Sequence, residues 1–150
     1  MSERRRVLLC HGWRVRDPYK SIGLLTGPLM DLGYEPILLQ YGFTLSPAQT
    51  RFVSNKYAKV WSARTRPSDI VIGHSNGARI AFEMSHIAQN RARTMVWINP
   101  ALDANCTPGR SVDRLLVLYN PGDTVVRLGS LIPNSIWGDM GYRGYVSADD

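Results

Sequence analysis

Short apolar runs alternate with longer amphipathic segments along this chain, and each apolar run has the length of one buried strand. This alternation is typical of a parallel sheet whose two faces are covered by helices. We expect five strands, at residues 7–10, 35–40, 69–73, 94–98 and 115–119, and a weaker sixth at 135–137. The pattern therefore predicts an α/β protein, a three-layer α/β/α sandwich with a mostly parallel sheet.

Apolar residues at spacings of three and four predict the helices. In residues 21–32 the apolar face is formed by Ile22, Leu25, Leu29 and Leu32, and Gly33 is placed to cap the end of the helix. A second helix is expected from Ser46, as N-cap, and Pro47 to about Ala63, with Phe52, Tyr57, Val60 and Trp61 as its apolar side chains. A third is expected over residues 76–90 and a short fourth over 125–131.

Size and composition fit one globular domain covering residues 1–150, with 44% hydrophobic and 20% charged residues. No segment approaches the roughly 20 apolar residues that span a bilayer, and the apolar run near the N-terminus is too short for a signal peptide. We therefore expect a cytoplasmic protein without a membrane partner. The only two cysteines, Cys10 and Cys106, indicate no disulfide framework.

The net charge of +6 and pI near 9.7 are compatible with an acidic partner such as nucleic acid. Apart from Arg4, Arg5 and Arg6, however, the basic residues are scattered through every segment. Scattered arginines favour a solvated surface over a phosphate-binding patch, so no nucleic-acid partner is expected. The oligomeric state stays open.

The strongest motif is Gly73-His74-Ser75-Asn76-Gly77, a G-x-S-x-G run between an apolar strand and a helix-forming stretch. This is the layout of a nucleophile elbow, in which a sharp strand-to-helix turn exposes the serine hydroxyl. Glycines flank it because a Cβ there would collide with the neighbouring strand or helix. The motif alone occurs by chance, so its strand–turn–helix context carries the prediction.

A serine nucleophile needs a base, an acid that orients the base, and donors for the oxyanion. The Asn76 N–H, at the start of the helix after Ser75, is one candidate donor. The first strand ends in His11-Gly12-Trp13, where glycine lets the backbone bend so that the Trp13 N–H faces the site. Asn76 and Trp13 are thus the expected oxyanion hole.

With G-x-S-x-G on an elbow and His-Gly after the first strand, the chain resembles the α/β-hydrolase family. The resemblance implies a triad acid in the segment Asn120-Pro121-Gly122-Asp123, and Asp123 is the matching position. The order of serine before aspartate agrees with that family. The same four residues are also good turn formers whatever the function.

The third member of the triad is where this sequence departs from the family, because no histidine follows His86. His11 belongs to the oxyanion segment, His74 is expected to point away from Ser75, and His86 is too far along the helix to reach the hydroxyl. Three explanations stay open: the histidine lies beyond these residues, Tyr142 stands in its place in a degenerate hydrolase, or the base is an unusual one.

Loops after the strands should line the pocket, since ligands of such sheets bind at the carboxyl ends of the strands. The expected pocket residues are His11, Gly12, Arg14, Tyr41, Asn99 and Pro100. Most of the nearby side chains are apolar, which favours a small apolar acyl group, and Arg14 or Arg16 would meet an acidic substrate part. Residues 101–113 leave no room for a large lid.

The sequence therefore predicts a serine hydrolase that cleaves a carboxylic ester, or a related acyl bond of a small molecule, through an acyl-enzyme on Ser75. The alternative is a binding or interaction protein that kept the fold and lost the base. No cofactor is expected, and no metal site either, since the histidines and cysteines lack ligand spacing.

Overall fold

The strands lie side by side in one open, wholly parallel sheet in the order β2-β1-β3-β4-β5. They are β1 (Arg6–Cys10), β2 (Glu35–Leu39), β3 (Ile70–His74), β4 (Thr94–Ile98) and β5 (Arg114–Leu118). This computed structural model describes residues 4–13, 15–42, 47–124, 127–128, 131 and 137–146. All five predicted strands are confirmed to within one residue at each end.

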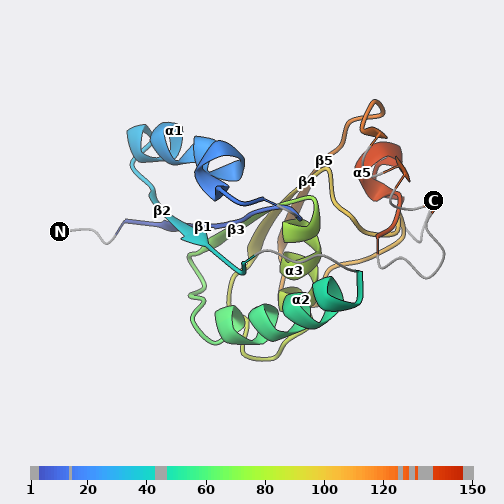
Figure 1. Cartoon of the computed structure of the whole chain (residues 1–150). Coiled ribbons are helices and arrows are strands. Elements are labelled where there is room, and N and C mark those ends of the chain that lie inside the picture. The colour runs from blue at the N-terminus through green and yellow to red at the C-terminus, as the bar shows by residue number, and fades with distance from the viewer. Residues whose placement is uncertain are drawn as a thin grey trace.

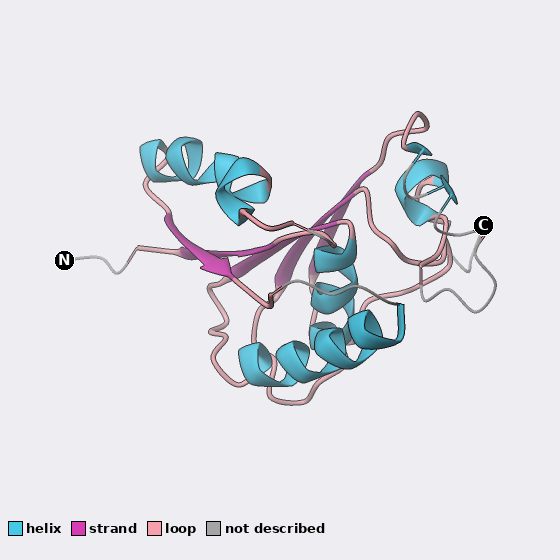
Figure 2. Cartoon of the chain, viewed as in Figure 1, coloured by secondary structure: helices cyan, strands magenta, loops and turns pink. Residues whose placement is uncertain are grey.

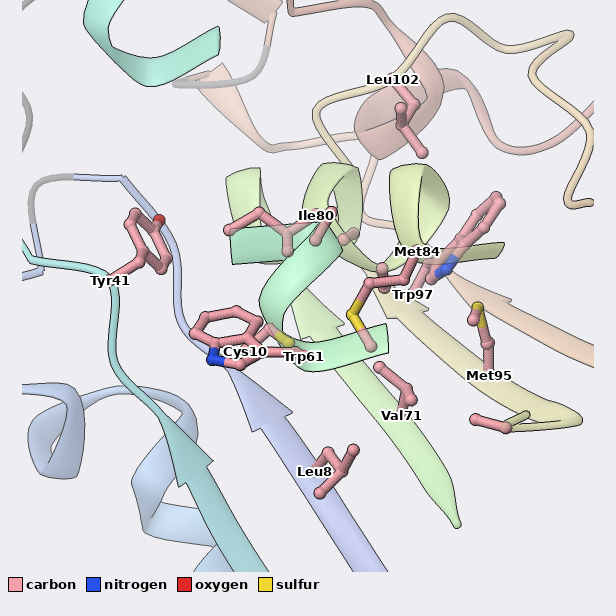
Figure 3. Packing of buried hydrophobic residues seen from close by; sticks show 14 of the residues in the cluster. Leu8, Cys10, Tyr41, Trp61, Val71, Ile80, Met84, Met95, Trp97 and Leu102 are labelled. Atoms are coloured by element: carbon pink, nitrogen blue, oxygen red, sulfur yellow. The ribbon is translucent and has the colours of Figure 1, made fainter. Parts of the chain in front are cut away.

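Two hydrophobic clusters on opposite faces of the sheet make the three layers (Figures 1 and 2). Because side chains alternate along a strand, Leu8 and Cys10 of β1 belong to one cluster, and Val7 and Leu9 to the other. The larger cluster lies beneath α2 (Pro47–Ser62) and α3 (Asn76–Ser85), with Trp61, Met84 and Trp97 among its members (Figure 3). The predicted sandwich is confirmed.

The smaller cluster is covered by η2 (Ile22–Leu25) and α1 (Thr26–Asp31), which follow a short turn, η1 (Pro18–Lys20). The prediction of one continuous α-helix over residues 21–32 was wrong, because η2 and α1 are separate elements there. Pro28 has no N–H to donate within a continuous helix, and it is tolerated because it lies in the first turn of α1. The cap prediction fits, since Gly33 has φ +83°. Leu32 does not face the core and is 72% exposed.

Helix α2 has the predicted bounds within the described residues, whereas Ser46 lies outside them. Its inward face is only partly the predicted one, since Trp61 and Tyr57 pack in the larger core cluster but Phe52 and Val60 do not. Small residues Thr50, Ser54 and Ala58 are buried at spacings of four, together with Trp61, while Phe52 and Val60 are exposed. Small side chains allow α2 to approach α3, which packs beside it.

Helix α3 ends at Ser85, five residues before the predicted end. The Ser85 carbonyl, which would accept the next helical bond, instead accepts a hydrogen bond from the Ser111 hydroxyl at 3.1 Å. The Gly109 N–H also donates to the Ser85 hydroxyl at 2.8 Å. The loop of residues 109–111 thus takes the place of another helical turn.

The chain after β5 closes over the carboxyl edge of the sheet with a short helix, α5 (Met140–Arg143). Its Met140 N–H donates to the Leu102 carbonyl at 2.7 Å, and Met140 joins the larger core cluster. The predicted helix at 125–131 lies mostly outside the described residues. So do the first two residues of the predicted strand at 135–137, and its third residue, Trp137, is in no regular element. Cys10 and Cys106 are both free thiols.

Candidate active site

Strands β1 and β3 are neighbours at the point where the chain reverses its direction across the sheet. Such a switch point leaves a crevice at the carboxyl ends of the strands, where ligands of open α/β sheets bind. Here it brings the segment after β1 against the segment after β3. A Cβ added to Gly12 would lie 3.3 Å from the Cβ of Ser75 and 3.2 Å from Nδ1 of His74.

Ser75 has the strained backbone of a nucleophile elbow. Its φ of 54° and ψ of −118° lie in a region that residues with a side chain rarely adopt. Three backbone hydrogen bonds hold this conformation: Ser75 donates to Ile98 at 2.9 Å, and its carbonyl accepts from Ala78 at 3.0 Å and from Ala101 at 3.2 Å. Ser75 as a whole is half-buried.

The two flanking glycines are required by close backbone contacts. A Cβ on Gly73 would lie 2.5 Å from the Cα of Ala78 in α3, and one on Gly77 would lie 2.1 Å from the Cys10 carbonyl oxygen of β1. No such contacts are found in real structures, so either addition would force the backbone apart. The predicted collision with both the helix and the neighbouring strand is confirmed.

A buried polar cluster behind the elbow was not foreseen from the sequence. The Asn76 amide donates to the Tyr41 hydroxyl at 3.2 Å, and that hydroxyl donates to the His11 carbonyl at 3.0 Å. The His11 ring stacks on the Tyr41 ring with centroids 4.0 Å apart, and its Nδ1–H donates to the Gly12 carbonyl at 2.8 Å. Tyr41 and His11 are 4% and 1% exposed, so both support the segment after β1 from the buried side.

Asp123 lies after β5, the edge strand of the sheet. It follows a turn in which the Asn120 side chain accepts from the Gly122 N–H at 2.9 Å. Burial lowers the pKa of His74, and the negative charge of Asp123 partly offsets that effect. The carboxylate is therefore within electrostatic range of the residue directly before Ser75, which the sequence did not reveal.

The other predicted pocket residues have mixed outcomes. Asn99 adopts φ +43° in the turn that bonds the elbow, and Pro100 next to it is buried. Trp13 packs edge-on against Trp137, with ring centroids 4.5 Å apart, and so forms an aromatic wall. Arg14 lies outside the described residues. His86 is at the far end of α3, exposed, and bonds to the Thr107 carbonyl, as its distance from Ser75 predicted.

A hollow of about 170 Å³ lies next to this site, at the carboxyl ends of β1 and β2. It is lined by His11, Val15, Arg16, Pro18, Gln40 and Gly42. Arg16 supplies a positive charge in this lining. The segment of residues 101–113 contains no helix or strand.

The described residues contain no group of three or more His, Cys, Asp and Glu side chains arranged to hold a metal ion. Among the same residues no helix has the length and apolar character needed to cross a bilayer.

The fold has counterparts among solved structures. The chain is similar to MGS-M1, an α/β hydrolase enzyme from a Medee basin deep-sea metagenome library, with a TM-score of 0.56 and 18% sequence identity. The match covers 82% of this chain and 58% of that one, so this chain spans little more than half the length of its structural neighbour. No family model and no curated protein matches. The likeness shows that the two proteins share an α/β fold.

Proposed function

We propose that this protein is a serine hydrolase in which Ser75 attacks the carbonyl carbon of an acyl substrate. The observation that carries the proposal is the backbone of Ser75, which is strained at φ 54° and locked by three hydrogen bonds. Strain of this kind costs about 1–3 kcal/mol and is found mainly at functional sites.

The oxyanion formed by this attack would be held by two backbone donors. The Asn76 N–H is at the N-terminus of α3, where N–H groups have no partner within the helix and the helix dipole favours negative charge. The Trp13 N–H follows Gly12, which packs directly against Ser75. Donors fixed in this way need no reorganisation when the charge develops.

Asp123 is assigned to orienting the base. The effect of its negative charge on the pKa of His74, the residue before Ser75, supports this role. No histidine follows Asp123 in the printed sequence, and we propose that the base is a histidine that these 150 residues do not contain. With it, acyl transfer proceeds through an acyl-enzyme on Ser75 that water then hydrolyses.

The substrate assigned to the site is a small carboxylic ester, with amide and thioester bonds as less favoured choices. The aromatic wall of Trp13 and Trp137 suits an apolar acyl group, and Arg16 suits an acidic part of the substrate. The short segment at residues 101–113 leaves the site without a large lid, as in a small esterase.

Labelling with a fluorophosphonate probe tests the nucleophile. We expect a form extended past residue 150 to label strongly, the 150-residue chain weakly or not at all, and neither form to label when Ser75→Ala is introduced. Ser68→Ala is the matched control, since Ser68 is exposed and precedes β3. Strong labelling that survives Ser75→Ala would refute the proposal.

A second candidate is a binding protein with the hydrolase fold and no activity. The absence of any histidine after His86 in the printed sequence favours it. An extended form that contains a histidine and labels at Ser75 excludes this candidate, whereas an extended form that contains one and does not label supports it.

A further inference from the structure

A second hollow, of about 410 Å³, lies at the opposite edge of the sheet from Ser75. It is formed where the chain enters β3, β4 and β5, and it is lined by Pro67, Asn90, Arg91, Arg93, Arg110, Ser111 and Asp113. Its volume is within the range of small-molecule sites, about 300–1,000 Å³. No part of the proposed hydrolase chemistry uses this edge.

Arginines dominate the charge of this hollow. Arg91 and Arg93 come from the segment before β4, and Arg110 comes from the loop before β5, so separate segments converge on one space. Arg93 pairs with Asp113 at 3.1 Å, the only carboxylate in the lining. Within the part of the chain that the structure describes, neither Arg91 nor Arg110 forms an ion pair. The hollow therefore carries excess positive charge.

The segments that carry these arginines are held by a buried network of hydroxyl and amide groups. The Thr65 hydroxyl accepts from the Arg91 N–H at 2.7 Å, and its single proton is shared between the Ser62 carbonyl at 2.8 Å and the Asn90 side-chain oxygen at 3.2 Å. The Asn90 amide in turn approaches the Ser111 hydroxyl at 3.5 Å, and that hydroxyl bonds to the Ser85 carbonyl. Thr65 and Asn90 are 5% and 4% exposed.

This network fixes the backbone on both sides of the hollow before any ligand arrives. The Arg110 loop is also held tightly at Gly109, where an added Cβ would lie 2.0 Å from the Ser85 carbonyl oxygen. A preformed backbone lowers the ordering cost of binding, because only the ends of the arginine side chains still have to be fixed. The scattered arginines of the sequence are thus gathered on a rigid frame.

We propose that this hollow is a binding site for a small phosphate-bearing ligand. Guanidinium groups pair with phosphate oxygens through two parallel hydrogen bonds, which a lysine cannot do. The unpaired Arg91 and Arg110 contact the phosphate, while Arg93, held by Asp113, adds positive charge at the rim. A hollow bounded by three segments suits a compact phosphate group better than an extended nucleic-acid backbone.

Isothermal titration with sodium pyrophosphate, at constant ionic strength, tests the proposal. We expect one pyrophosphate per chain, and at least about tenfold weaker binding in each of Arg91→Gln and Arg110→Gln, which corresponds to about 1.4 kcal/mol per charge-assisted contact. Arg51→Gln is the matched control, because Arg51 is exposed on α2 away from the hollow. Its affinity should stay within about twofold of the parent.

Three results would overturn the proposal: no pyrophosphate binding by the parent chain, binding that both variants retain, and binding that Arg51→Gln weakens as much as they do. A parallel titration with a short DNA duplex tests whether this surface binds the phosphates of nucleic acid instead of a small ligand. Duplex binding that the same two variants abolish, without pyrophosphate binding, would assign this surface to nucleic acid and reject the small-ligand site. Thermal unfolding of each variant confirms that the fold is retained, as expected for exposed arginines.

Discussion

The two edges of the same parallel sheet are built by different means. At the carboxyl edge, glycines let backbones touch and Ser75 is held in a strained conformation. At the amino edge, hydroxyl and amide side chains such as Thr65 and Asn90 hold relaxed loops that present arginines. The carboxyl edge fixes the position of Ser75, and the amino edge holds arginine side chains around the second hollow. An added carbon atom at Gly77 should therefore damage the carboxyl edge, and a lost hydroxyl at Thr65 the amino edge.

The largest effect on stability is expected from Gly77→Ala at the carboxyl edge. The new Cβ would meet the Cys10 carbonyl oxygen at 2.1 Å, so α3 has to move away from β1. We expect a loss of about 3 kcal/mol or more in the free energy of unfolding, measured by urea denaturation. Gly27→Ala is the control: a Cβ there meets nothing within 4 Å, and Gly27 is in α1, so a gain of up to about 1 kcal/mol is expected. If Gly77→Ala and Gly27→Ala changed the free energy of unfolding equally, the close backbone contact at Gly77 would not be important for stability.

A smaller loss is expected at the amino edge from Thr65→Val, which keeps the shape of the side chain and removes its hydroxyl. The Arg91 N–H would lose its acceptor, and the Ser62 carbonyl and the Asn90 side-chain oxygen would lose the hydroxyl proton that they share. Burying unsatisfied polar groups costs about 1–3 kcal/mol, so unfolding free energy should fall by that amount. Thr107→Val, at an exposed position, should change it by less than about 0.5 kcal/mol. If Thr65→Val left the free energy of unfolding unchanged, the hydrogen-bond network would not stabilise the amino edge of the sheet.

Sequence patterns were most informative where the signal is local. The five strands and the tight turn between β3 and α3 were predicted correctly because short apolar runs and the spacing of Gly73 and Gly77 are read within a few residues. The strained turn at Ser75 is likewise specified by its flanking glycines.

What the sequence did not show depends on contacts between distant segments. Helix α3 stops at Ser85 because residues 109–111 bond to it, and no pattern inside the helix indicates this. Phe52 is exposed because α2 faces α3 through small residues. The arginines of the second hollow are scattered in sequence and meet only because Arg91 and Arg110 precede neighbouring strands. The proximity of Asp123 to His74 also arises from the order of the strands.

A gain in stability is expected from Ser75→Gly, which releases the strain at the carboxyl edge. Glycine adopts φ 54° freely, so the variant recovers about 1–3 kcal/mol of strain and loses about 0.5–1 kcal/mol through the greater freedom of its unfolded chain. The net expectation is about 1 kcal/mol of added stability in urea denaturation. Ser75→Ala keeps the strained φ and should show no such gain. If the two variants are equally stable, the strain at Ser75 is not significant.

The smallest expected effect on the free energy of unfolding comes from protonation of His74, the residue before Ser75 at the carboxyl edge. Burial lowers its pKa below the ordinary value of 6.5, and Asp123 raises it part of the way back. The unfolded chain therefore binds more protons in mild acid, so unfolding free energy should fall as the pH drops through 6.5 and below, by less than about 1.4 kcal/mol per pH unit for this one group. Asp123→Asn removes the offsetting charge, and an NMR titration of the imidazole should then show a still lower pKa for His74. A pKa unchanged by Asp123→Asn would place the carboxylate too far from the elbow to orient a base beside Ser75, whereas a lowered one supports the triad geometry independently of activity.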